Sequence, residues 1–96
     1  MATIETTTFR LAPGADEAAF LAADRTVQTE LVYLQPGLVR RTLARRGDEW
    51  LVITVWASEE HAAAAAAAAD AHPLRRAFDQ HLQPGSVQVA RYDTFE

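Results

Sequence analysis

The 96-residue sequence contains no cysteine, no lysine and no asparagine. The absence of cysteine excludes disulfide bonds, thiolate nucleophiles and thiolate metal ligands, and it fits a reducing cytoplasm. Lysine is also missing as a nucleophile, and the chain has only two serines, Ser58 and Ser86. Because covalent catalysis needs such groups, the chemistry left to this chain is acid–base or electrostatic.

Targeting and membrane signals are absent as well. Residues 1–5 lack a basic region followed by an apolar one, and no apolar run approaches the roughly 20 residues that a membrane span needs. The net charge of -4 disfavours a nucleic-acid partner. All nine basic residues are arginine, but neighbours on a strand point to opposite faces, so Arg40-Arg41 and Arg45-Arg46 cannot form a one-sided phosphate track. We expect a soluble, cytoplasmic protein without nucleic-acid or membrane partners.

The size of the chain predicts one compact domain over residues 1–96. A hydrophobic content of 49% is too high for a disordered chain, and the length is too short for two ordinary cores. A domain this small buries a modest share of its surface, so self-association is a natural way to complete its core.

Hydrophobic periodicity predicts the first half of the chain as a strand, a helix and the first strand of a hairpin. Residues 3–11 are rich in β-branched types and form the strand. Asp16 and Glu17 place negative charge at a helix start, and the helix ends at residues 34–37. Its apolar stripe recurs every three or four residues, at Phe20, Ala23, Val27, Leu31 and Leu34.

The second half of the chain predicts the rest of the hairpin, a second helix and a last strand. Residues 38–57 contain two strand-like runs around Gly47-Asp48, which suits a type II′ turn. Ser58 is a good N-cap for a helix through eight consecutive alanines. His72-Pro73 interrupts this helix, because the residue before proline avoids helical angles. A short helical continuation follows, and residues 86–95 form the last strand.

A repeated tetrapeptide indicates the topology. The sequence Leu-Gln-Pro-Gly occurs at residues 34–37 and 82–85, each time between a helix and the strand that follows. A doubled β-α-β unit produces this arrangement. The order β-α-β-β-α-β predicts an α+β, ferredoxin-like domain with a four-stranded antiparallel sheet and both helices on one face.

Alternation along the hairpin predicts that both faces of the sheet are apolar. Two helices cover only one face, so we expect the tryptophan-rich face to pack against a second copy of the chain in a barrel-like homodimer. Polar side chains among these tryptophans predict a ligand cavity there. One face carries Ala44, Leu51, Ile53 and Val55 with Arg40, Thr42, Arg46 and Glu49, and the other carries Val39, Leu43, Trp50, Val52 and Trp56 with Arg41, Arg45 and Thr54.

The order of motifs resembles a known family. Pro-Gly, helix, Pro-Gly, hairpin and then Trp56-Ala57-Ser58-Glu59-Glu60 at the start of the second helix are similar to the dimeric α+β barrel superfamily, and within it to antibiotic biosynthesis monooxygenases. The resemblance implies a homodimer with a pocket between sheet and helices. It also implies oxidation of phenols or quinols without flavin or metal, and therefore no cofactor. Haem-degrading relatives use an asparagine, this tryptophan and a histidine; Trp56 matches, and the asparagine has no counterpart.

Cofactor-independent oxygenation needs few protein groups. A bound phenol that loses its proton becomes electron-rich enough to reduce dioxygen, so the protein must supply a base, a partner for the phenolate and exclusion of water. His72 is the candidate catalytic base by residue type. Trp56, Arg41, Trp50 and Thr54 are the candidate ligand-binding residues.

Three of these candidates also have a purely structural interpretation. The structural interpretation of His72 is a solvent-facing residue at a helix end. Arg41 either holds an anionic ligand or stacks on a tryptophan, or it forms an ion pair at the dimer interface. Trp56 is either a pocket wall or part of the interface core. The spacing of His61, His72 and His81 matches no metal motif, so no metal site is expected.

Two functions remain open from the sequence. One is a cofactor-independent monooxygenase that acts on a small phenol- or quinol-type ligand. The other is a non-catalytic homodimeric protein that binds a small ligand, or a stress-type α+β barrel of unknown activity. The alanine run serves either function, because an alanine-faced helix can lie close to the sheet and leave space beneath it for Trp56 or a ligand.

Overall fold

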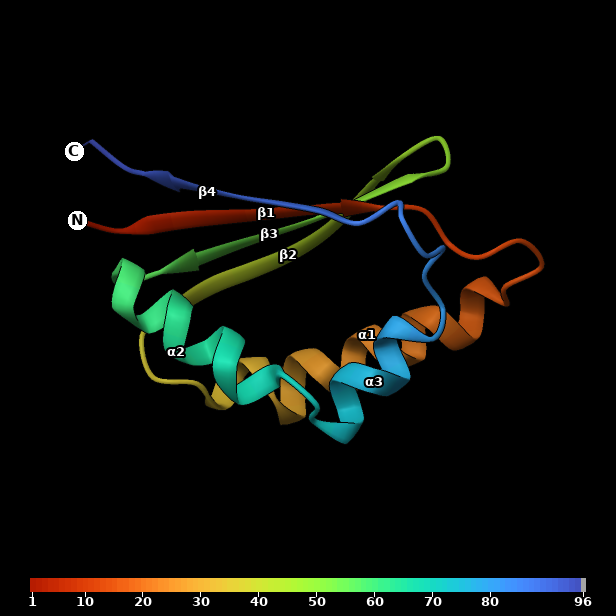
Figure 1. Cartoon of the computed structure of the whole chain (residues 1–96), viewed down its shortest axis with the longest axis horizontal. Coiled ribbons are helices and arrows are strands. Elements are labelled where there is room, and N and C mark those ends of the chain that lie inside the picture. Colours follow the sequence, from red (N-terminus) through yellow and green to blue (C-terminus); the bar gives the residue numbers. More distant parts are fainter. Residues whose placement is uncertain (96) are drawn as a thin grey trace.

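The computed structural model describes residues 1–95, which form an antiparallel sheet with helices on one of its faces (Figure 1). The strand order is β2-β3-β1-β4, and each neighbouring pair is antiparallel. This arrangement confirms the predicted ferredoxin-like fold. The elements are β1 (Thr3–Phe9), α1 (Glu17–Glu30), the 3-10 turn η1 (Val32–Leu34), β2 (Leu38–Arg46), β3 (Glu49–Trp56), α2 (Glu59–Ala69), α3 (Pro73–Asp79) and β4 (Gln88–Asp93).

Helix α1 begins where the sequence predicts and ends earlier. Asp16 caps it, since its Oδ1 accepts hydrogen bonds from the backbone N–H groups of Ala18 and Ala19. The α-helical hydrogen bonding stops at Glu30, and η1 continues the chain. Leu34 is therefore exposed and does not belong to the buried stripe of α1.

The β2–β3 hairpin has the predicted register from Arg40 onward. Gly47 has a φ of +60°, as a type II′ turn requires at its first central position, and Arg45 pairs with Trp50. Near the start of β2 the register shifts, because Leu38 pairs with Trp56 while Arg40 pairs with Val55. The prediction for Val39 was wrong, since this bulge leaves its side chain 63% exposed and off the tryptophan face.

The break after the alanine helix is also where the sequence predicts it. Ser58 caps α2, and its Oγ accepts a hydrogen bond from the His61 N–H. At the other end Ala71 has a left-handed φ of 64° and His72 is extended. Pro73 then begins α3, a position where its missing N–H removes no helical hydrogen bond. None of the helices in residues 1–95 is long and apolar enough to cross a membrane.

The expectation that the tryptophan-rich face meets a second copy was wrong. Trp50 and Trp56 are 6% and 4% exposed within a single chain. Trp50 packs with Phe20 of α1 and Phe78 of α3, while Trp56 packs with alanines of α2. Since these helices supply the large apolar surface that the indoles need, the tryptophan face is the inner face of the sheet.

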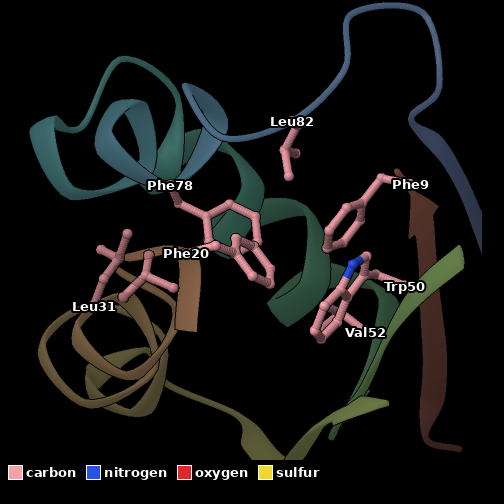
Figure 2. Packing of buried hydrophobic residues seen from close by; sticks show 8 residues of the cluster. Phe9, Phe20, Leu31, Trp50, Val52, Phe78 and Leu82 are labelled. Carbon is pink, nitrogen blue, oxygen red and sulfur yellow. The ribbon is translucent and has the colours of Figure 1, made fainter. Parts of the chain in front are cut away.

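An aromatic cluster forms the core under α1 and α3 (Figure 2). The ring of Phe20 lies edge-to-face with Phe9 and Trp50, with centroids 5.7 and 5.0 Å apart. Phe9 contacts Phe78 in the same manner at 5.8 Å. Such pairs contribute about 0.5–1.5 kcal/mol beyond the burial of their area, so this cluster anchors the two helices on the sheet.

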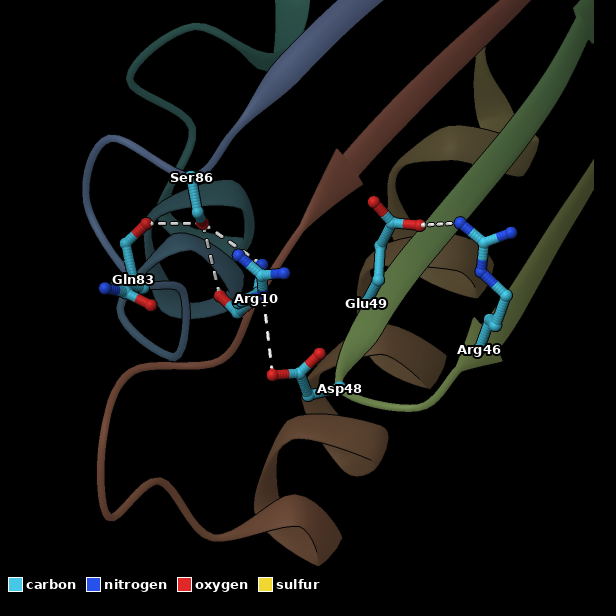
Figure 3. Close-up of polar contacts among 6 residues, drawn as sticks. All are labelled: Arg10, Arg46, Asp48, Glu49, Gln83 and Ser86. Carbon is cyan, nitrogen blue, oxygen red and sulfur yellow. Dashed lines mark hydrogen bonds and ion pairs between the residues drawn. The ribbon is translucent and has the colours of Figure 1, made fainter.

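Hydrogen bonds and ion pairs close the turn end of the sheet (Figure 3). Ser86 Oγ donates to the Gln83 carbonyl at 2.7 Å and accepts from the Arg10 N–H at 3.1 Å. Arg10 also lies 3.4 Å from Asp48 in the hairpin turn, where both side chains are exposed. These contacts hold the second Leu-Gln-Pro-Gly loop against the end of β1, which assigns Ser86 a structural role.

The outer face of the sheet lies away from the helices (Figure 1). Pairing places Ile4 of β1 between Val55 of β3 and Tyr92 of β4 on this face, with Ile53 and Leu51 further along β3. The four aliphatic side chains are only partly buried, and Tyr92 is exposed. The apolar face that the chain's own helices leave uncovered is therefore this outer face.

Candidate functional site

A cavity of about 220 Å³ lies between the inner face of the sheet and the helices. All four strands contribute to its walls, together with α1, α2 and α3. Most of the lining is apolar, with four alanines of α2 on one side. The polar lining residues are Glu5, Thr7, Gln35, Arg41, Thr54, Arg75, Asp79 and Arg91.

Trp56 forms one wall of this cavity at the end of β3. Its ring packs on Ala62 and Ala65, whose small side chains let α2 approach the indole closely. The indole Nε1 is fully buried, and within residues 1–95 it has no hydrogen-bond partner. An unsatisfied buried donor costs roughly 1–3 kcal/mol, so the Trp56 N–H is a polar group that the rest of residues 1–95 leaves without a partner.

Arg41 also lines the cavity, and two residues of α1 hold it. Its Nη2 donates to Asp24 Oδ1 at 2.7 Å, and its Nη1 donates to Gln28 Oε1 at 3.1 Å. The interpretation of Arg41 as an ion pair across a dimer interface was wrong. Its carboxylate partner, Asp24, belongs to helix α1 of the same chain. Asp24 carries a signal in the sequence, since it lies four residues after Phe20 and three before Val27 on the apolar stripe.

Thr54 of β3 lies on the inner face between two cross-strand partners, Arg41 of β2 and Glu5 of β1. Glu5 Oε2 accepts a hydrogen bond from Arg91 Nε at 2.8 Å, and Arg91 Nη1 donates to Glu59 Oε1 at 3.0 Å. These bonds raise the pKa of Arg91, that to Glu5 most strongly. The guanidinium therefore stays charged and ties β4 to β1 and to the first turn of α2.

Glu5 and Arg91 are site residues that the sequence reasoning missed. Alternation could have found Glu5, because in a strand from residue 3 it shares a face with Thr7 and Phe9. Arg91 could not be placed in this way, since its position depends on the pairing of β4 with β1.

Trp50 does not line this cavity, although it shares the inner face of β3 with Trp56. It belongs to the aromatic core, and the guanidinium of Arg45 lies over its ring at 5.0 Å from the centroid. The structure therefore brings together three of the predicted ligand-binding residues, Trp56, Arg41 and Thr54, and places Trp50 elsewhere.

His72 lies outside the cavity lining as well. Its Nδ1 accepts a hydrogen bond from the Leu74 N–H at 3.1 Å and so caps α3. His61 Nδ1 lies 2.7 Å from Ser58 Oγ at the start of α2. Over residues 1–95, no three His, Asp or Glu side chains gather closely enough to hold a metal ion. The role of His72 as a base stays a prediction, and its observed contact is structural.

Comparison with known proteins identifies solved structures that have the same fold. No protein-family model matches the sequence, and no curated protein matches it. Several solved structures do match this chain in their fold. SnoaB, a cofactor-independent oxygenase from Streptomyces nogalater, superposes with a TM-score of 0.77 at 19% identity, over 99% of this chain and 94% of that one. The chain has the fold of this oxygenase.

Two further solved structures share this fold. A protein from Bordetella bronchiseptica, provisionally named an antibiotic biosynthesis monooxygenase, has a TM-score of 0.80 at 16% identity and covers 99% of this chain and 98% of its own. One of the same provisional name from Caulobacter crescentus has a TM-score of 0.77 at 15% identity, with 99% and 91% covered. The resemblance to antibiotic biosynthesis monooxygenases is confirmed at the level of fold.

Proposed function

We propose that this protein is a cofactor-independent monooxygenase that oxidises a small phenol or quinol in the cavity beside Trp56. The observation that carries the proposal is a mainly apolar cavity lined by Trp56, a residue whose buried N–H has no partner within residues 1–95. An apolar cavity with a few convergent polar groups is typical of a small-molecule site. The named activity of SnoaB, which has this fold, supports the same choice.

The reaction balances with the substrate as its own reductant. In the oxidation of a phenol by one dioxygen molecule, a ring C–H carbon becomes a carbonyl and the product is a quinone. The second oxygen atom leaves as water with the ring hydrogen and the hydroxyl hydrogen. The chain contributes surroundings: apolar walls that exclude water, the Trp56 N–H as donor to a ring oxygen, and the Glu5 carboxylate as acceptor for a ring hydroxyl.

Replacement of Trp56 by phenylalanine tests this function. Trp56→Phe keeps an aromatic wall and removes the N–H, so we expect kcat/KM for oxygen uptake with small hydroquinones to fall at least about tenfold. Trp50→Phe is the matched control, because Trp50 lies outside the cavity. Uptake by the wild-type protein no faster than in buffer, or equal activity of the two variants, would refute the proposal.

We further propose that the protein is a homodimer whose two copies meet through the outer faces of their sheets. Ile53 lies near the centre of this face, between Thr6 of β1 and Thr42 of β2. A second copy offers the same apolar surface, and an apolar face of this kind is rarely left in water. We expect sedimentation equilibrium to give a dimer for the wild type and a monomer for Ile53→Glu.

The control for this prediction is Leu34→Glu. Leu34 is exposed on η1 and does not belong to the sheet, so this variant adds the same charge at another apolar position. It should remain a dimer. A wild-type protein that stays monomeric at micromolar concentration would contradict the proposed interface.

A non-catalytic ligand-binding protein is the second candidate function. The observation that favours it is the lack of histidine in the cavity lining formed by residues 1–95. In that case hydroquinones bind, and oxygen uptake stays at the buffer rate. The oxygen-uptake measurement described for Trp56 therefore distinguishes the two functions.

A further inference from the structure

We infer that this cavity selects uncharged aromatic ligands and rejects anionic ones, and that Asp24 and Glu5 determine the selection. The inference deepens the proposed function by naming the substrate class of the same cavity. It concerns binding, so it can be tested without turnover.

Each guanidinium that residues 1–95 place in the cavity lining is already paired with a carboxylate. Arg41 donates to Asp24 at 2.7 Å. Arg91 donates to Glu5 at 2.8 Å and to Glu59 at 3.0 Å. The third pair is Arg75 with Asp79, at 3.0 Å within α3. Four carboxylates thus accompany three guanidinium groups around this cavity.

The innermost pair is shielded from water. The side chains of Arg41 and Asp24 are 5% and 12% exposed. A charge in such surroundings is tolerated only when it is paired, and removing one partner leaves a costly unpaired charge. Arg41 therefore cannot leave Asp24 for a ligand without leaving a buried carboxylate behind.

This arrangement lowers the affinity of the cavity for an anionic ligand. Such a ligand must lose its own hydration in a largely apolar cavity, and it finds carboxylates already bound to the available cations. A neutral hydroxyl group meets the opposite situation, because it can donate to a carboxylate such as Glu5 without displacing an arginine.

The cavity also limits the size of the ligand. An engineered apolar cavity of roughly 150 Å³ holds benzene, and sites for drug-sized ligands begin near roughly 300 Å³. At about 220 Å³ this cavity lies between the two. The part of a ligand that this cavity can enclose is therefore an aromatic group of one ring or of two fused rings.

Isothermal titration calorimetry with three two-ring probes tests the selection at neutral pH. The probes are 2-naphthol and 2-naphthamide, both uncharged, and 2-naphthoate, which is ionised because a carboxylic acid titrates near pH 4. The amide and the carboxylate have nearly the same shape and differ in charge. The wild-type protein should bind 2-naphthol and 2-naphthamide at least about tenfold more tightly than 2-naphthoate.

Two variants test the residues that determine it. Asp24→Asn keeps the shape of the side chain and frees the charge of Arg41, so the preference for 2-naphthamide over 2-naphthoate should shrink to about threefold or less, or reverse. Glu5→Gln should also reduce the preference for 2-naphthamide, because it frees part of the charge of Arg91. This variant provides the test if Asp24→Asn does not fold. Glu17→Gln is the control, because Glu17 pairs with Arg45 outside the cavity lining.

The outcomes separate this inference from the proposed function. Equal binding of 2-naphthoate and 2-naphthamide by the wild type overturns it, and so does binding of no probe at all. A preference that folded Asp24→Asn and Glu5→Gln proteins leave unchanged overturns the assignment to these residues. Selective binding of uncharged probes without oxygen uptake supports the inference and refutes the monooxygenase.

Discussion

Truncation of Phe20 to alanine is expected to lower the free energy of unfolding by about 3–5 kcal/mol. Phe20 is 0% exposed and its ring contacts Phe9, Trp50 and Phe78. Its removal deletes apolar contacts and leaves a cavity that the rigid sheet cannot close. Urea denaturation followed by far-UV circular dichroism measures the loss.

Another phenylalanine supplies the control for this prediction. Phe95 is 89% exposed, so Phe95→Ala should change the free energy of unfolding by no more than about 0.5 kcal/mol. A Phe20→Ala protein that is nearly as stable as Phe95→Ala would show that the aromatic cluster does not anchor α1 on the sheet.

Replacement of Gly37 by alanine is expected to destabilise the protein by roughly 2–4 kcal/mol, through two separate effects. Gly37 has a φ of +84°, a conformation that costs L-residues energy. A Cβ at this position would also overlap the ring of His61. Because His61 lies in the first turn of α2, the overlap would also shift the helix that packs on Trp56.

The second copy of the same tetrapeptide separates these effects. Gly85 has the same φ of +84°, and a Cβ there would meet nothing within 4 Å. Gly85→Ala should therefore show only the backbone cost, about 1–2 kcal/mol. The double variant Gly37→Ala/His61→Ala no longer has the overlap. Its loss of unfolding free energy should therefore not exceed the backbone cost at residue 37 plus the loss caused by His61→Ala alone. Equal destabilisation by Gly37→Ala and Gly85→Ala in thermal or urea unfolding would rule out the contact with His61.

Local features of the fold were predictable from the sequence because they depend on neighbouring residues. Ser58 caps α2, the turn at Gly47 sets the register of the hairpin, and Pro73 begins a new helix as expected. The bulge at Val39 was not predictable, since a register shift depends on the partner strand.

The site was predictable in part. Trp56, Arg41 and Thr54 were chosen because they share a strand face, and all three line the cavity. His72 was chosen by residue type, and the structure uses it to cap α3.

The sequence by itself determined the order of the elements, the turn of the hairpin and which side chains share a face, because backbone geometry sets these over a few residues. Only the tertiary structure decided that the face with both tryptophans lies beneath the helices, that Asp24 neutralises Arg41, and that Glu5 and Arg91 meet at the cavity. The physical reason is that alternation sorts side chains into two faces without preferring either. The choice depends on partners distant in the chain, here the aromatic rings and the carboxylate that α1 and α3 bring to the sheet.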